Sequence, residues 1–365
     1  MPKNGKIDMM ADINEQILEI EKEIRETPYH KGTEHHIGKL RARLSQLRDK
    51  VLNQSTKKSG GGGGYAVKKQ GDATVVLVGP PSAGKSTLIN KLTNAKSKVA
   101  PYAFTTVSVI PGMMRMKSAY IQILDVPGLI EGAHEGKGRG REVLSVVRAA
   151  DLLVIMSDLT RVREIEEIKK TLENNGVRIN KARPKVNIEK KLNGGISIHT
   201  NIRQDLDNET IKEIARDMGI KNAEISINEK ITMDSLIDAF SRSRVYVPAI
   251  FILNKADMGA VSDSFSIDLL ISASEGVGLP KLQDLIWQSL NFVEVFLVRG
   301  DEEPSFKNPM IMKTNNTLKD VALKIGSDFL EDKKRAKIWN SGAKFPGQEV
   351  SLNTRVQEGM QVRFV

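Results

Sequence analysis

A glycine-rich segment of the sequence fits phosphate binding. Residues 79–86 read Gly-Pro-Pro-Ser-Ala-Gly-Lys-Ser, a full match to GxxxxGK followed by Ser or Thr. In such a loop the backbone N–H groups and the following helix N-terminus attract phosphate, because both present unpaired donors. Gly84 lets the backbone approach closely, Lys85 places a charge on the β- and γ-phosphates, and Ser86 offers a hydroxyl to Mg²⁺. The predicted phosphate-binding residues are Gly79, Pro80, Pro81, Ser82, Ala83, Gly84, Lys85, Ser86 and Thr87.

A second motif supplies an acidic partner for the metal. The run 120–124 predicts a strand that delivers Asp125, followed by Val-Pro-Gly. In this arrangement Asp125 holds Mg²⁺ through water, and the N–H of Gly128 meets the γ-phosphate. Thr106, chosen over Thr105, is expected to close over the γ-phosphate and to add a metal ligand in the triphosphate state only. The direct metal ligands predicted from the chain are therefore Ser86 and Thr106.

Two further motifs indicate which base is bound. The strand predicted at 247–253 ends in Asn254-Lys255-Ala256-Asp257, where a buried carboxylate can accept hydrogen bonds from N1 and N2 of guanine. Adenine would leave that carboxylate unpaired, at a cost of about 1–3 kcal/mol. The segment Ser272-Ala273-Ser274 brings a backbone amide near guanine O6. Four motifs in this order, each after a predicted strand, predict guanine-nucleotide binding and argue against a P-loop ATPase or kinase. The residues predicted around the base are Asn254, Lys255, Asp257, Ser272, Ala273 and Ser274.

The sequence does not identify a catalytic residue. Leu129 stands where small signalling GTPases carry the glutamine that positions the attacking water. An aliphatic side chain forms no hydrogen bond, so we expect slow unaided turnover. Backbone groups, the metal, a monovalent cation, residues 131–141 or a partner protein remain open as sources of catalysis. His134 is more easily read as structural than as a base. A nucleotide-gated scaffold with little turnover therefore stays as the alternative function.

Strands and helices that alternate along the chain position these motifs. The runs 73–78 and 152–156 predict buried strands, and residues 87–92 predict a helix after the phosphate loop. The chain between Asp158 and Asn254 is far longer than an ordinary crossover, which predicts an inserted small α/β domain. The strands and helices predicted within it are 194–199, 223–227, 211–218 and 235–240. Its basic segment 181–191 is either a ligand surface or a solvated loop.

The two ends of the chain have patterns of their own. Apolar residues repeat at helical spacing from Ile13 to Ile24 and from Leu40 to Val51, which predicts a helical hairpin. It either packs on the next domain or faces RNA. Short strands around one helix at 318–325, capped by Thr317, predict a β-grasp module at the other end. The strands predicted there are 293–298, 310–313, 337–339, 348–352 and 361–365.

Composition narrows the class of protein and the compartment. The 365-residue chain has no cysteine, which excludes disulfides, thiolate catalysis and thiolate zinc sites. No apolar run reaches the roughly 20 residues of a membrane span, so we expect a cytoplasmic protein without membrane contact. The net charge of +10 favours RNA or a ribonucleoprotein as partner. Basic residues cluster between Lys39 and Lys58 and again between Lys333 and Lys337.

The motifs resemble a known family. Phe104-Thr105-Thr106 and the run from Asp125 to Ala133 resemble the Obg-related translation-factor GTPases. Gly132 to Gly140, Arg244 to Pro248 and Glu34 to Leu40 resemble, within that group, the DRG (developmentally regulated GTP-binding protein) family.

That resemblance implies an α/β protein with a P-loop GTPase domain at 65–290. It also implies a helical N-terminal region at 1–58, a small α/β domain inserted at 160–246 and a C-terminal TGS domain of β-grasp fold at 291–365. The implied activity is Mg²⁺-dependent hydrolysis of GTP to GDP by a switch that acts on ribosomes or RNA, with a regulatory protein partner open. Some relatives carry Asn at the position of Ser82, where it supports K⁺; the shorter serine leaves potassium open.

Overall fold

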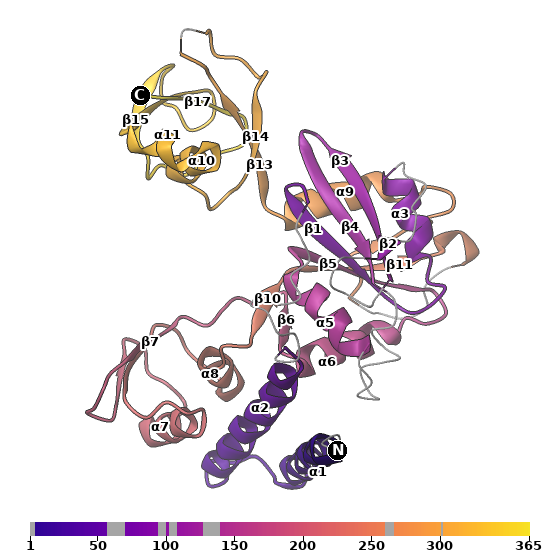
Figure 1. Ribbon diagram of the computed structural model, residues 1–365, viewed down its shortest axis with the longest axis vertical. Coiled ribbons are helices and arrows are strands. Elements are labelled where there is room, and N and C mark those ends of the chain that lie inside the picture. Colours follow the sequence, from indigo (N-terminus) through magenta and orange to yellow (C-terminus); the bar gives the residue numbers. More distant parts are fainter. Residues whose placement is uncertain are drawn as a thin grey trace. The chain divides into compact units, whose positions relative to one another are not determined.

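The structure is a computed structural model of the chain. It describes residues 4–56, 70–93, 100–101, 108–126, 139–259, 266–300 and 302–365. The chain divides into two compact units that are each built from separate segments (Figure 1). The first unit comprises Met1–Tyr65 and Lys169–Val247, and the second comprises Ala66–Ile168 and Pro248–Val365.

A seven-stranded sheet forms the centre of the second unit. Its strand order is β12-β11-β5-β1-β4-β3-β2, and β1 pairs in parallel with β4 and β5. The bounds are β1 Ala73–Val78, β2 Ala100–Pro101, β3 Ser108–Met116, β4 Ala119–Asp125, β5 Leu152–Asp158, β11 Ala249–Asn254 and β12 Leu269–Leu270. Every residue of β1 and β5 is buried, as expected for apolar strands that are covered on both faces. The helices of this part are α3 Lys85–Thr93, α5 Arg139–Ala149 and α9 Leu279–Ser289, and α6 Glu164–Asn174 runs across the boundary between the units.

This topology confirms the strand predictions at 73–78, 120–124 and 152–156 within two residues. The carboxyl ends of β1, β4, β5 and β11 lie at the same edge of the sheet because these strands are parallel. The antiparallel strand β3 was not predicted. It contains Pro111 and Gly112, residue types that usually interrupt a strand.

The strand predicted at 247–253 is present as β11 within two residues, and the structure has a separate short strand before it that was not predicted. β10, Val245–Val247, pairs with β6, Val177–Ile179, whereas β11 begins at Ala249 and joins the central sheet. Pro248 separates them. A proline has no N–H to donate to a ladder, while its carbonyl oxygen accepts a hydrogen bond from the Leu153 N–H at 3.0 Å.

A five-stranded sheet forms the C-terminal part of the second unit, in the order β14-β13-β17-β15-β16. Its strands are β13 Phe292–Leu297, β14 Pro309–Lys313, β15 Arg335–Trp339, β16 Gln348–Ser351 and β17 Met360–Phe364. All five predicted strands are present within two residues. Helix α10, Leu318–Ile325, begins after Thr317 as predicted, and Thr317 N donates to the Asp320 carboxylate at 2.7 Å. The short helix α11, Ser327–Glu331, was not predicted.

The first unit combines the N-terminal hairpin with a small α/β layer. Helices α1, Asn4–Glu26, and α2, Glu34–Thr56, pack through Ile13, Ile20 and Leu47, as the helical spacing predicted. The α/β layer contains β7 Val186–Lys190, β8 Ile196–Thr200, β9 Ala223–Ile227, α7 Asn208–Asp217 and α8 Met233–Phe240. Ile37 and Ala42 of α2 belong to the apolar core of this layer. Within this unit, α2 therefore packs on both α1 and the α/β layer.

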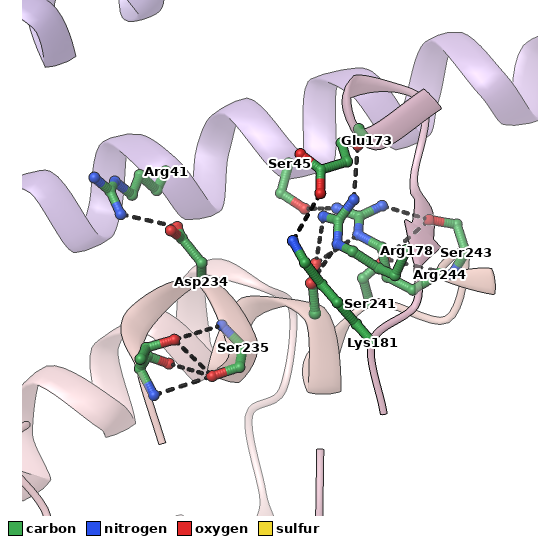
Figure 2. Close-up of polar contacts among 12 residues, drawn as sticks. Arg41, Ser45, Glu173, Arg178, Lys181, Asp234, Ser235, Ser241, Ser243 and Arg244 are labelled. Atoms are coloured by element: carbon green, nitrogen blue, oxygen red, sulfur yellow. Dashed lines mark hydrogen bonds and ion pairs between the residues drawn. The ribbon is translucent and has the colours of Figure 1, made fainter. Parts of the chain in front are cut away.

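A buried network of charges joins α2 to the end of α8. Arg244 is 8% exposed, and its guanidinium donates to Asp49 and Asp238, each at 2.8 Å, and to Ser45 at 2.5 Å. Asp238 also accepts hydrogen bonds from Nε and Nη2 of the Arg178 guanidinium, at 2.5 and 2.6 Å. Figure 2 shows Arg178 and Arg244 side by side next to Ser45 of α2. Removal of Arg244 would leave the Asp49 carboxylate without a cationic partner in a largely buried site, which is costly.

We therefore expect Arg244→Ala to loosen α2 from the α/β layer. Loss of one side of a buried ion pair costs about 3–5 kcal/mol, so amide hydrogen exchange in residues 34–51 should accelerate at least a hundredfold. The control is Arg43→Ala, which removes an exposed arginine of the same helix and should change exchange less than about threefold. Equal exchange in the two variants would contradict a structural role for the network.

Candidate nucleotide site

The glycine-rich loop joins the end of β1 to the start of α3. Ser82 and Gly84 have positive φ angles of 60° and 94°, which turn the backbone between strand and helix. A Cβ atom on Gly84 would lie 2.2 Å from Nδ2 of Asn254, so this position has no room for a side chain. Pro81, Ser82, Ser86 and Thr87 are exposed, whereas Ala83 is fully buried. The loop therefore presents its polar groups outward while its base is fixed against β11.

Lys85 lies within this loop rather than in solvent. Its side chain is 8% exposed, and Nζ donates to the carbonyl oxygens of Gly79 and Pro80, both at 2.9 Å. An ammonium group held in this way is a fixed positive charge at the N-terminus of α3, where the helix dipole adds to it. The geometry suits an anion.

Ser86 and Asp125 come together at the ends of neighbouring elements. The Ser86 hydroxyl donates to Oδ2 of Asp125 at 3.0 Å, and Asp125 is 6% exposed. Its other oxygen, Oδ1, is buried and has no hydrogen-bond partner among the described residues. Burial raises the pKa of Asp125, and the Lys85 charge and the Ser86 hydrogen bond oppose that rise. A hydroxyl beside an unsatisfied carboxylate oxygen is a donor set that fits Mg²⁺.

Asn254 connects two loops that are far apart in the sequence. Its Nδ2 donates to the carbonyl of Ala83 at 2.8 Å, and its Oδ1 accepts from the N–H of Ala273 at 2.9 Å. The side chain is 3% exposed, so both hydrogen bonds are protected from water. The predicted phosphate and base segments are therefore held together by one side chain.

Asp257, predicted to meet the base, is exposed in the chain without nucleotide. Lys255 has a left-handed φ of 64°, and the chain then turns through the short 3-10 helix η1, Ala256–Met258, at the surface. The Asp257 carboxylate could be buried only by a group that covers it. In the neighbouring loop, Ser272 is 1% exposed and its Oγ accepts from the Glu275 N–H at 3.3 Å, whereas Ser274 is exposed.

Asp158, which the sequence reading did not assign to the site, holds Lys255 in place. Oδ2 of Asp158 lies 3.0 Å from Nζ of Lys255 and 2.7 Å from the Arg161 guanidinium, and Oδ1 accepts from Thr160 at 2.7 Å. These hydrogen bonds, that of Arg161 above all, hold the pKa of Asp158 well below its usual range. No local pattern in the sequence marked this role, because only the pairing of β5 with β11 brings Asp158 level with Asn254.

Two predicted site residues, Gly128 and Thr106, lie outside the described residues, as do Thr105, Leu129 and His134. Among the predicted residues that are described, three groups form: the phosphate loop with Lys85, the pair of Ser86 and Asp125, and the segments joined by Asn254.

The sequence is similar to known families over nearly its whole length. A family model described as a 50S ribosome-binding GTPase matches residues 74–191, and a model of the C-terminal region of the MMR_HSR1 domain matches residues 193–292. An uncharacterised GTP-binding protein of Methanocaldococcus jannaschii is 41% identical over 98% of this chain and 94% of its own length. Developmentally-regulated G-protein 3 of Arabidopsis thaliana is 38% identical over 98% of this chain and 99% of its own. Developmentally-regulated GTP-binding protein 2 of Homo sapiens is 34% identical over 97% of this chain and 99% of its own length.

The chain belongs to the DRG family. The resemblance inferred from the sequence is thereby confirmed, and the chain contains a P-loop GTPase domain of mixed α/β structure. GTPases of this kind use Mg²⁺ together with their nucleotide, and the donor set at Ser86 and Asp125 fits that ion.

Solved structures give weaker similarity. The YchF GTPase of Schizosaccharomyces pombe is 14% identical, with a TM-score of 0.42, over 82% of this chain and 99% of that one. A structure of Aquifex aeolicus Era with GDP and AlF4⁻ is 18% identical, with a TM-score of 0.34, over 74% of this chain and 73% of that one. The assignment to the DRG family rests on the sequence relatives. In the part of this DRG-family chain that the structure describes, no helix combines the length and apolarity needed to cross a membrane.

The depressed pKa of Asp158 gives a prediction about pH. A carboxyl whose folded pKa is lowered stabilises the fold above its unfolded value of 3.8, and this contribution is lost as pH falls toward the folded pKa. Asp158→Asn should therefore lower the free energy of unfolding at pH 7. The difference from the wild type should shrink as the pH falls below about 4. Urea denaturation of both proteins at pH 7 and pH 3 measures this. An equal difference at the two pH values would show that Asp158 is not held ionised by its neighbours.

Proposed function

We propose that this DRG-family chain binds GTP and hydrolyses it to GDP and phosphate as a Mg²⁺-dependent switch that acts on ribosomes or RNA in translation. The observation that carries the proposal is the pair of hydrogen bonds from the Asn254 side chain to Ala83 and Ala273. These bonds hold the phosphate-binding loop and the base-binding segment next to each other, as a nucleotide site requires. A nucleotide bound along these segments would place its phosphates in the loop before α3 and its base beside residues 254–257 and 272–274.

Phosphate binding would use groups that are already in place. Lys85 would exchange its carbonyl acceptors on Gly79 and Pro80 for phosphate oxygens, and the loop N–H groups would surround the same oxygens. Ser86 would bind Mg²⁺ directly and Asp125 through water, which would satisfy its unpaired Oδ1. The ion supplies neutralisation of charge on the phosphate oxygens. Thr106 and Gly128 would complete the γ-phosphate contacts, as the sequence predicts.

Base selection would depend on Asp257. The carboxylate is exposed in the chain, so a purine that covers it must satisfy both of its oxygens. Guanine offers two donors and adenine does not. Lys255, held by Asp158, would pack its alkyl chain along the base, and a backbone amide near Ala273 would reach O6.

The division into domains supports this function. We propose a helical N-terminal region at 1–58, a GTPase domain at 65–290 with a small α/β insertion at 160–246, and a TGS domain at 291–365. A five-stranded mixed sheet with α10 packed in its apolar core supports a β-grasp fold for the last region. The net charge of +10 and the matched ribosome-binding GTPase model support RNA or a ribosome as partner.

A scaffold that holds nucleotide with little turnover is the second candidate. The observation in its favour is Leu129 at the position of the water-orienting glutamine. Both candidates share the nucleotide site and differ only in the rate of hydrolysis. A regulatory protein, the ribosome or K⁺ near Ser82 could each raise that rate.

Guanine selection predicts a change of substrate in one variant. Asp257→Asn replaces two acceptors by one acceptor and one donor, so GTP affinity should fall at least tenfold while xanthosine triphosphate binds better than GTP. Competition against a fluorescent nucleotide measures both affinities. The matched control is Asp284→Asn, an exposed residue of α9, which should leave both unchanged. Unchanged GTP affinity in Asp257→Asn would rule out this residue as the base-selecting group.

Slow hydrolysis is the second expected outcome. Purified protein in sodium buffer should release phosphate from GTP at about 10⁻⁴–10⁻² s⁻¹, as switch GTPases do without a stimulating partner. Leu129→Ala should change this rate less than about threefold, whereas Lys85→Ala should abolish binding and turnover. A rate of several per second would contradict the assignment. No release with wild-type protein, even with ribosomes and K⁺, would favour the scaffold.

A further inference from the structure

An open hollow lies within the first unit, between α2, β7 and the ends of α7 and α8. Its volume is about 800 Å³, within the range of ligand sites. A second hollow of about 330 Å³ adjoins it and shares Ala239, Ser241 and Arg242, and we call the two neighbouring hollows together the groove. The basic segment 181–191, which the sequence left open as a ligand surface or a solvated loop, contributes to both.

The floor of the groove is apolar and well supported. Ile188 of β7, Met218, Ile220 and Phe240 all line it and belong to or pack against the core of the α/β layer. Gly219 follows α7 with a φ of 82°, and the helix ends there with the Ile220 N–H bonded to the Ala215 carbonyl and the Gly219 N–H to that of Arg216. Nε2 of Gln46 donates a hydrogen bond to the carbonyl oxygen of Asp217. The carbonyls of Ala215, Arg216 and Asp217 at this helix end are therefore hydrogen-bonded within the protein.

The acidic residues that line the larger hollow, Asp49 and Glu189, have cationic partners within the protein. Both oxygens of Asp49 are occupied, by Arg244 and Ser243 on one side and by Ser241 on the other. Glu189 is exposed and lies 3.6 Å from Lys191, which is also 3.3 Å from Glu224. Figure 2 shows Ser241, Ser243 and Arg244 clustered in the same network.

The cations at the rim have no such partners. Lys50, Lys190 and Arg242 are exposed, and within the described part of the chain no carboxylate pairs with any of them. Arg183, in the adjoining hollow, lies over the Tyr246 ring at 5.6 Å. The groove therefore combines an apolar floor with uncompensated positive charge around it.

We propose that this groove binds single-stranded RNA, with phosphates on Lys50, Lys190 and Arg242 and a base on the apolar floor. A single strand offers both features at once, because its phosphates are regularly spaced and its unstacked bases expose flat apolar faces. An RNA duplex hides those faces, and an acidic peptide has none. The inference rests on the proposed function in that RNA is the partner named there, and it gives that partner a binding site.

The test is fluorescence anisotropy with a labelled single-stranded RNA of twelve nucleotides and the full-length chain. The variant is the triple substitution Lys50→Ala, Lys190→Ala, Arg242→Ala. Its affinity should fall at least tenfold, and loss of three phosphate contacts should flatten the slope of log affinity against log salt by about 2. An abasic oligonucleotide of equal length should bind wild-type protein several-fold more weakly than the RNA.

The control removes the same charge elsewhere in the first unit: Lys170→Ala, Arg203→Ala, Lys221→Ala, all exposed and outside the groove. It should change affinity less than threefold, and GTP affinity should be the same in all proteins. Equal RNA binding by both triple variants and the wild type would overturn the groove but leave the GTPase proposal intact. A glutamate-rich peptide that displaces RNA at equal concentration would also overturn it. Wild-type protein that binds GTP but no RNA would refute both the groove and RNA as partner.

Discussion

The candidate site depends on one buried amide. Asn254 ends a central strand, and its side chain uses one donor and one acceptor to fix two loops, through Ala83 and Ala273. Few side chains could take this place, since an aspartate has no donor and a larger side chain would meet Gly84, whose Cβ position lies 2.2 Å from the amide nitrogen. Gly84 and Asn254 are thus complementary. Because β1, β5 and β11 are parallel, Gly84 and Asn254 lie at the same edge of the sheet. The topology of the sheet therefore determines the geometry of the site.

A different balance of forces maintains the first unit. Its core is apolar, but α2 is attached to it through buried charge as well, with Asp238 between two arginines and Asp49 between Arg244 and two serines. Such pairs add little net stability compared with apolar contacts, but they are directional. Apolar faces alone would tolerate a helix that slides along its axis. The hydrogen bonds of Arg244 to Ser45 and Asp49 fix the register of α2.

Sequence reasoning succeeded where a local pattern determines the structure. The buried strands, the phosphate loop, the hairpin and the strands after residue 290 follow from apolar periodicity and short motifs. The structure has these strands within two residues, and both hairpin helices are present but longer than the periodic runs. It failed where a distant contact decides. The split at Pro248 depends on β10 pairing with β6, and β3 forms despite Pro111 and Gly112 because β4 lies beside it. Asp158 was missed because it meets Lys255 only through the register of β5 with β11.

The number of basic residues in a segment does not by itself predict whether that segment attracts a polyanion. The stretch from Lys39 to Lys58 is rich in cations, but Lys39 pairs with Glu213, Arg41 with Asp234 and Arg48 with Glu21. In the C-terminal patch Arg335 pairs with Glu349. Each exposed pair contributes only a few tenths of a kcal/mol to stability, yet it cancels charge that a polyanion would otherwise meet. Attraction for a polyanion therefore depends on which cations lack a carboxylate within reach. That is a property of tertiary contacts, so two segments of equal charge in the sequence can differ in what they bind.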